Sequence, residues 1–322
     1  MTPDVSVIIP TYNRAAMLHE AIASVLAQQD VRLELIVVDD GSTDGSCDDL
    51  ASLIETARGA AQVTFRLVRN IRNRGVAAAR NAGVANATAP LIAFLDSDDL
   101  WAPTKLRRQI DFMRASSGCQ IAQTEEIWIR DGRRVNPGRR HEKRAGDIFV
   151  ASLRTCLISP SAVMMRTELF TALRGFDEQM IAAEDYDLWL RILRHHQVGL
   201  IEEPLVTRRA GHPGQLSATV PAIDRFRILA LLKLLAGIDL SRERRVAIGE
   251  VLTEKCGVFA QGLKRRGDEA AAGFIRDVAD HTGTWVSGPN AGLEQAISGL
   301  RAMLGPTQVP DADREPIELE AR

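Results

Sequence analysis

Three clusters of acidic side chains are the residues of this chain best suited to chemistry. They are 39–44 (DDGSTD), 96–99 (DSDD) and the pair Glu184-Asp185, and the first two directly follow apolar runs. Carboxylates can bind hard divalent cations, accept hydrogen bonds from a base or a ribose, and remove protons from attacking hydroxyls. The clusters therefore predict one polar site, provided that the fold brings them to a common edge.

The cluster at 96–99 is the candidate metal site. If the chain continues extended after the apolar run 91–95, Asp96 and Asp98 project to the same side. A helix cap, which is the structural alternative, needs only one aspartate, and three adjacent carboxylates repel one another unless a cation lies among them. Magnesium typically binds one or two carboxylates together with phosphate oxygens. We therefore expect Asp96 and Asp98 to bind a hard divalent cation such as Mg²⁺.

The remaining charged candidates have structural explanations beside the functional ones. Asp39 and Asp40 precede glycine and serine, which is ordinary turn chemistry, although either carboxylate could bind a nucleoside. Glu184 and Asp185 begin a predicted helix, where acidic residues favour the helix dipole without any further role. Arg80 lies on an alanine-rich helical segment and is either a diphosphate ligand or a solvated charge.

Alternating strand and helix signals in the first hundred residues explain how these clusters would meet. Strands are expected at 5–9, 33–38, 63–68 and 91–95, and helices at 17–26, 50–56 and 75–86. Continuous apolar strands separated by helices are typical of a mostly parallel sheet that is covered on both faces. Ligands of such α/β sheets bind beyond the carboxyl ends of the strands. The sequence therefore predicts an α/β fold with its site at that edge.

The pattern changes after residue 101. We expect a helix at 105–114, two strands on either side of the polar stretch 130–144, a helix at 184–194 and a short strand at 201–207. Within 130–144, arginine and lysine outnumber acidic residues by about five. Helices are then expected at 223–235, 241–265 and 269–279, and the proline-rich acidic tail 305–322 is expected to be disordered.

Composition excludes several functional classes. The 322 residues carry 40 Lys and Arg against 42 Asp and Glu, and a net charge of −2 gives no reason to expect nucleic acid. The four cysteines are far apart, which argues against structural zinc or a disulfide framework and favours a cytoplasmic location. The acidic start reads as neither signal peptide nor membrane anchor. The phosphate-binding patterns GxGxxG and GxxxxGK[ST] are absent.

Five motifs, in this order, resemble those of the family 2 glycosyltransferases. They are 5–14 (VSVIIPTYNR), 37–44 (VVDDGSTD), 73–81 (NRGVAAARN), 94–99 (FLDSDD) and Glu184-Asp185, so that the resemblance covers roughly residues 5–215. It implies the GT-A fold, a nucleotide-sugar donor that is commonly linked to UDP, Mg²⁺ or Mn²⁺ as cofactor, and inversion at the anomeric carbon.

The same resemblance implies a role for each matching residue. Asp96 and Asp98 correspond to the DXD motif, with Asp98 the direct metal ligand and Asp96 nearer the ribose, and Asp185 of the ED pair Glu184-Asp185 is the expected base. His212 matches a histidine of a loop that closes over the donor, and is a further metal-ligand candidate. The residues expected to line the nucleotide pocket are Pro10, Thr11, Tyr12, Arg14, Asp39, Asp40, Arg80 and Asp96.

These expectations divide the chain into a GT-A domain at 1–215, a helical appendage at 221–304 and the tail. Residues 1–100 would bind the nucleotide and 101–215 the acceptor, which could be a glycan, a lipid-linked glycan or a protein in polysaccharide or cell-envelope synthesis. The apolar stripe of 223–235, flanked by Arg225, Arg227 and Lys233, indicates either a helix packed on its neighbour, in the monomer or in a homodimer, or a peripheral contact with the inner face of the membrane.

Two other functional classes fit parts of the pattern. One is a phosphoryl-transfer hydrolase, because an Asp-x-Asp after an apolar strand also serves aspartyl-phosphate enzymes. In those enzymes the motif normally follows the first strand, whereas here it follows the fourth. The other class is a non-catalytic module that binds sugar nucleotides or polyanions through 130–144, and the intact pair Glu184-Asp185 argues against it.

Overall fold

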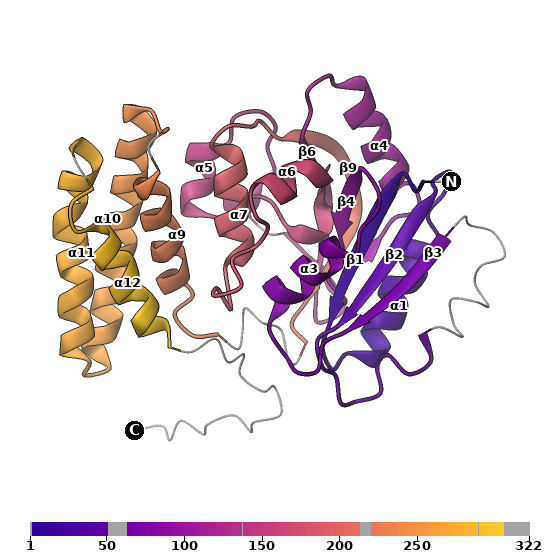
Figure 1. Ribbon diagram of the computed structural model, residues 1–322, viewed down its shortest axis with the longest axis horizontal. Coiled ribbons are helices and arrows are strands. Elements are labelled where there is room, and N and C mark those ends of the chain that lie inside the picture. Colours follow the sequence, from indigo (N-terminus) through magenta and orange to yellow (C-terminus); the bar gives the residue numbers. More distant parts are fainter. Residues whose placement is uncertain are drawn as a thin grey trace.

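A mixed sheet runs through the molecule, with helices on both of its faces (Figure 1). The computed structural model describes residues 2–50, 63–136, 138–212, 220–237, 239–288 and 290–305. Within these residues the sheet has nine strands in the order β3-β2-β1-β4-β8-β6-β9-β5, and β7 pairs with β6. The helix expected at 50–56 and the tail expected from residue 305 lie outside the described residues, apart from their first positions.

The first four strands form the parallel half of the sheet, as the apolar runs predict. They are β1 (Val5–Thr11), β2 (Leu33–Asp39), β3 (Val63–Arg69) and β4 (Leu91–Phe94). Pro10 lies inside β1 rather than at its end. The backbone carbonyl of Ile8 points toward β4 and accepts a hydrogen bond from Leu95 N. The backbone N of Pro10, two residues later, points to the same side, beyond the last residue pair between β1 and β4. The missing N–H of Pro10 therefore costs no ladder hydrogen bond.

The second half of the sheet adds antiparallel pairs, so that the whole sheet is mixed, as the GT-A resemblance implies. Its strands are β5 (Leu100–Trp101), β6 (Ile121–Arg130), β7 (Arg133–Val135), β8 (Val163–Arg166) and β9 (Gly199–Ala210). β6 runs parallel to β9, whereas β8 is antiparallel to both β4 and β6. We expected one strand on each side of the stretch 130–144. This prediction is wrong, because β6 and β7 form a hairpin whose turn lies at the start of that stretch. β9 also extends beyond the expected 201–207.

Two hydrophobic cores lie on opposite faces of the sheet, because successive strand side chains point to opposite faces. In β1, Val5, Val7 and Ile9 join one core with α1 (Ala15–Leu26) and α4 (Lys105–Ala115). Ile8 joins the other. The helices of that second core are α3 (Val76–Ala85), α5 (Phe149–Arg154), α6 (Thr167–Ala172), α7 (Glu184–Leu193) and the C-terminal helices. Gly83 of α3 lies so close to β1 that an added Cβ would be 2.4 Å from Ile8 Cγ2.

The C-terminal helices continue the second core (Figure 1). They are α9 (Asp224–Ala236), α10 (Arg242–Arg265), α11 (Glu269–Ser287) and α12 (Leu293–Leu304). Four apolar residues of α9, Ile228, Leu231, Leu232 and Leu235, are fully buried, and α9 contacts α7, α10 and α12. The packed-helix interpretation of 223–235 is therefore confirmed, and α9 has no apolar face left for a membrane. No helix in the described ranges combines the length and the apolar character needed to span a membrane.

Candidate active site

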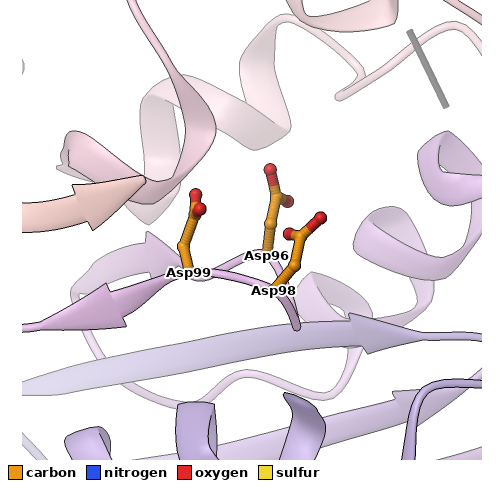
Figure 2. A group of neighbouring side chains, drawn as sticks. All are labelled: Asp96, Asp98 and Asp99. Atoms are coloured by element: carbon orange, nitrogen blue, oxygen red, sulfur yellow. The ribbon is translucent and has the colours of Figure 1, made fainter. Parts of the chain in front are cut away.

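The acidic residues after β4 form a tight turn. The backbone N–H of Asp99 donates to the carbonyl of Asp96 at 2.9 Å, so that this segment turns instead of continuing extended as expected. Carboxylate oxygens of Asp96, Asp98 and Asp99 lie within 4.8 Å of one another. Figure 2 shows all three side chains projecting to the same side of the loop. The turn, rather than strand alternation, therefore brings Asp96 and Asp98 together and adds Asp99, which the motif had not singled out.

Asp98 is the carboxylate on which distant parts of the chain converge. Its Oδ2 accepts from Arg14 Nη1 at 2.6 Å and lies 2.8 Å from His212 Nε2. Arg14 follows β1 and His212 follows β9, so the loops at the ends of these strands meet at one oxygen. Carboxylate oxygens with an imidazole nitrogen form a donor set suited to Mg²⁺ or Mn²⁺. An ion at this oxygen would have to share it with, or take it from, Arg14.

Asp99 shows the electrostatic cost of the cluster. The side chain is buried, accepts from Ser161 Oγ at 2.6 Å and accepts from the backbone N–H of Arg209 at 2.9 Å. Burial raises the pKa of Asp99 well above its ordinary value, and the neighbouring charges of Asp98 and Asp96 raise it further. Either a proton or a cation relieves this repulsion. Asp99 is buried, whereas Asp96 and Asp98 are half-buried, so Asp96 and Asp98 are the more accessible candidates for a metal ion.

Arg80 connects the acidic turn to the ED pair. Its Nη2 lies 2.6 Å from Asp96 Oδ1, its Nη1 lies 2.6 Å from Glu184 Oε1, and its side chain is only 4% exposed. The sequence suggested a diphosphate ligand or a solvated charge at this position. The solvated charge is wrong, because Arg80 is buried between two carboxylate partners and so holds the two acidic motifs at a fixed separation. The diphosphate contact stays a prediction.

The ED pair lies at the first turn of α7. Ala183, which precedes it, has a left-handed backbone (φ 56°), so the helix begins abruptly at Glu184. Glu184 is buried, and burial together with the charge of Asp185 outweighs Arg80 and raises the pKa of Glu184 to about 7. Asp185 is half-buried; its Oδ1 accepts from Tyr186 N at 2.7 Å. Asp185 is therefore the more accessible carboxylate of the pair.

The expected nucleotide pocket lies at the carboxyl ends of β1 and β2. Pro10 and Thr11 end β1, and the half-buried Tyr12 follows them in the connecting loop. The loops after the two strands are joined, since Asn13 N donates to Ser42 Oγ at 3.0 Å. The structure thus brings these strand ends together, as the motifs predict.

Asp39 and Asp40 differ in their surroundings. Both oxygens of Asp40 accept from the loop before α3, with Arg74 N at 3.0 and 3.1 Å and Gly75 N at 2.8 Å. Asp39 Oδ1 accepts from Ser42 N at 2.8 Å. Asp40 therefore holds the loop before α3 in place. For Asp40 this agrees with the structural role that the sequence had left open beside nucleoside binding.

A comparison with known protein families identifies the class of protein to which this chain belongs. The family model described as Glycosyl transferase family 2 matches residues 6–172, which is just over half of the chain. This chain belongs to that family. A Rickettsia felis protein described as an uncharacterized glycosyltransferase is 34% identical over 201 residues, which are 62% of this chain and 32% of that protein. The chain spans about a third of the length of the first curated relatives it matches.

Solved structures show the same fold at low identity. S. aureus TarS 1–349 in complex with UDP superposes with a TM-score of 0.67 at 18% identity, covering 94% of this chain and 90% of that one. A match of this extent has to include most of the C-terminal helices. The Pyrobaculum calidifontis mannosyltransferase PcManGT, in complex with GDP-Man and Mn²⁺, gives a TM-score of 0.56 at 19% identity and covers 94% of this chain and 87% of that one. The expected GT-A fold is confirmed.

Proposed function

We propose that this chain transfers a sugar from a nucleotide-sugar donor, with UDP as the nucleotide, to an acceptor hydroxyl, with inversion and with the assistance of Mg²⁺ or Mn²⁺. One observation carries the proposal: Arg80 joins Asp96 of the acidic turn to Glu184 of the ED pair, at 2.6 Å on each side. Glycosyl transfer needs charge stabilisation for the leaving diphosphate and a base for the acceptor. The two motifs provide both, side by side.

The donor nucleoside would bind at the ends of β1 and β2, against Pro10, Thr11, Tyr12 and Arg14. Asp39 is the better partner for the base, because Asp40 is engaged by the backbone of the loop before α3. The fold likeness to complexes with UDP and with GDP-Man supports a nucleotide-sugar donor. It leaves the identity of the base and sugar to experiment.

Asp98 and Asp96 would hold the metal, with His212 beside Asp98 as a further ligand. When bound, the ion neutralises the negative charge that develops on the leaving nucleoside diphosphate. Arg14 pairs with Asp98, Arg80 pairs with Asp96, and His212 Nε2 lies 2.8 Å from Asp98 Oδ2. These contacts orient the two carboxylates for a cation.

Asp185 would remove the proton from the attacking acceptor hydroxyl. Its Oδ1 accepts from Tyr186 N at 2.7 Å, and its Oδ2 accepts from the Cys156 thiol at 3.5 Å. The long contact with the thiol is weak, so Oδ2 is the oxygen that would accept the proton of the acceptor hydroxyl. Glu184 is buried against Arg80 and suits a positioning role. A single displacement with attack from the face opposite the leaving group produces inversion.

The alternative functions make different predictions for one assay. We would incubate the protein with a panel of nucleotide sugars and Mn²⁺, follow the melting temperature, and measure release of nucleoside diphosphate and of inorganic phosphate. A true donor raises the melting temperature by mass action and yields nucleoside diphosphate. Release of inorganic phosphate would indicate a hydrolase, and stabilisation without any turnover would indicate a binding module.

The acceptor and the cellular setting remain predictions from the sequence. They comprise a glycan, lipid-linked or protein acceptor, a role in polysaccharide or cell-envelope synthesis, a homodimer, and a cytoplasmic location with or without peripheral contact with the inner face of the membrane. The prediction of a membrane contact was based on the apolar stripe of α9, and this stripe is buried inside the protein.

A further inference from the structure

Six exposed arginines gather on the β6–β7 hairpin and the segment after it. This basic hairpin surface consists of Arg130, Arg133, Arg134, Arg139, Arg140 and Arg144. Within the described parts of the chain, none of the six has a carboxylate within ion-pair distance, whereas surface arginines such as Arg107 and Arg154 pair with Asp111 and Glu254. The chain as a whole has a net charge of −2, so the surface is a local concentration of positive charge.

The basic hairpin surface is anchored on buried contacts. Lys143 Nζ lies 3.1 Å from Glu126 Oε1 on β6 and donates to Ser159 Oγ at 3.1 Å. The ring of His141 lies 5.3 Å from that of Trp128, centroid to centroid. Lys143 and His141 therefore hold the backbone of segment 139–144 against β6, which places its exposed arginines on one surface.

The half-buried Arg208 lies between this surface and the site. Trp128 of β6 lies opposite Arg208 of β9, and the Arg208 guanidinium lies 4.7 Å from the centroid of the Trp128 ring. Burial opposes the charge of Arg208, but Glu126 and then the carboxylates of Asp99, Asp96 and Asp185 outweigh it and raise the pKa of Arg208. Arg208 thus lies within the electrostatic field of both acidic motifs.

The base of the hairpin also adjoins the loop that carries His212. Arg130 lies opposite Ala210, and Asp131 N donates to the carbonyl of Ala210 at 3.3 Å. Gly211 comes next, with φ +86°, and a Cβ there would lie 2.5 Å from Asp131 Oδ1. This close approach, which glycine permits, places the basic hairpin surface beside the histidine that contacts Asp98.

We propose that the basic hairpin surface binds an acceptor glycan that carries repeated anionic groups, phosphate or carboxylate, and directs it past Trp128 and Arg208 to Asp185. The proposal rests on the proposed glycosyl transfer and names the acceptor class. Guanidinium groups bind phosphate and carboxylate oxygens through two parallel hydrogen bonds, and all six exposed cations are arginine. Such a surface also raises the local concentration of an anionic polymer at the site.

The test compares two triple variants of the full chain. Arg133/Arg134/Arg139→Gln removes three charges from the basic hairpin surface, and Lys264/Arg265/Arg266→Gln removes three exposed charges at the end of α10. Labelled inorganic polyphosphate and oligogalacturonate serve as phosphate and carboxylate probes, with neutral maltohexaose as the control. Binding is measured by fluorescence anisotropy at about 50 mM and about 300 mM salt, which changes the screening length. Calorimetry with UDP and Mn²⁺ is run on every variant.

We expect at least one polymer to bind the unmodified protein, to bind more weakly at high salt, and to lose about tenfold in affinity in the hairpin variant only. The responding probe then tells phosphate from carboxylate. Equal losses in both variants, or no polymer binding at low salt, would overturn the proposal. So would binding to anionic phosphatidylglycerol vesicles without binding to either polymer, which would assign the surface to a membrane. A failure of UDP and Mn²⁺ to bind would instead count against the glycosyl-transfer proposal.

Discussion

The N-terminal strands and the C-terminal helices support the site in different ways. β1, β2 and β4 carry candidate residues directly at their carboxyl ends, so their motifs are short and local. The C-terminal helices carry none of the candidate residues. Their Lys233, on α9, lies 2.7 Å from Asp187 and 2.8 Å from Asp177, and thereby holds the helix on which Asp185 lies. The strand ends carry the candidate metal and nucleotide residues, whereas the C-terminal helices pack against α7, which carries the candidate base Asp185.

The largest expected effect tests the base. Asp185→Asn should lower the transfer rate at least about a hundredfold, because the amide cannot accept the acceptor proton. Donor binding should be retained, since the substitution keeps the size of the side chain. Rates are measured as nucleoside diphosphate release, with Glu184→Gln as the comparison. A mild effect of Asp185→Asn together with a severe effect of Glu184→Gln would mean that the two roles are exchanged.

The next effect concerns the donor side. Asp98→Asn removes the charge on which Arg14 and His212 converge, and should weaken metal-dependent UDP binding by about tenfold or more. Calorimetry with UDP, with and without Mn²⁺, measures it. Asp111→Asn, on the exposed side of α4, is the matched control and should bind normally. If the Asp98 variant binds UDP with an unchanged metal-dependent affinity, the assignment of Asp98 as a metal ligand is wrong.

A smaller effect is expected from the supporting helices. Lys233→Met removes a cation from the buried Asp187, which keeps only Arg191, and should cost about 2 kcal/mol of folding free energy. Chemical denaturation measures the stability, with the exposed Lys264→Met as control. If α9 holds α7 in place, the transfer rate of the folded variant also falls while the affinity for UDP does not. A variant of normal stability and rate would show that the two regions are independent.

The smallest effect is a change of stability with pH. The pKa of Glu184 is raised from 4.5 to about 7, so its contribution to stability is complete below 4.5 and is lost as the pH rises through about 7. Glutamine cannot ionise and is free of this loss. The melting temperature of Glu184→Gln relative to the unmodified protein should therefore rise by a few degrees between about pH 5 and about pH 8. A constant difference across this range would show that Glu184 is ionised throughout.

The same two regions differ in how well the sequence predicts them. The apolar runs located β1 to β4 to within two residues. β1, β2 and β4 are buried along their whole length, and a strand buried on both faces must be apolar throughout, whereas β3 lies at the sheet edge and is partly exposed. The acidic motifs at 39–44 and 96–99 were found because they directly follow two of these runs. Helices α9 and α10 were also predicted closely, whereas α12 was not recognised as a separate helix and β9 proved longer than expected.

The contacts between distant residues that assemble the site could not be predicted, because they leave no pattern in the sequence. Arg80 and Glu184 are 104 positions apart, and Lys233 and Asp187 are 46 apart. A single ion pair between distant residues has no periodicity and is chosen by the fold rather than by neighbouring residues. Asp99 was counted in the acidic cluster but given no role of its own, because the expected extended segment did not include the turn that brings Asp99 to Asp96.

Arg80 also has a thermodynamic consequence. A single guanidinium balances Asp96 on one side and Glu184 on the other. If a cation neutralised Asp96, Arg80 would stabilise the ionised form of Glu184 more strongly. The pKa of Glu184 would therefore fall. Linkage is reciprocal, and ionisation of Glu184 would change the cation affinity at Asp96 by the same factor. Cation binding at Asp96 near neutral pH would then release protons into the buffer. The number of protons released would measure the coupling between cation binding at Asp96 and ionisation of Glu184.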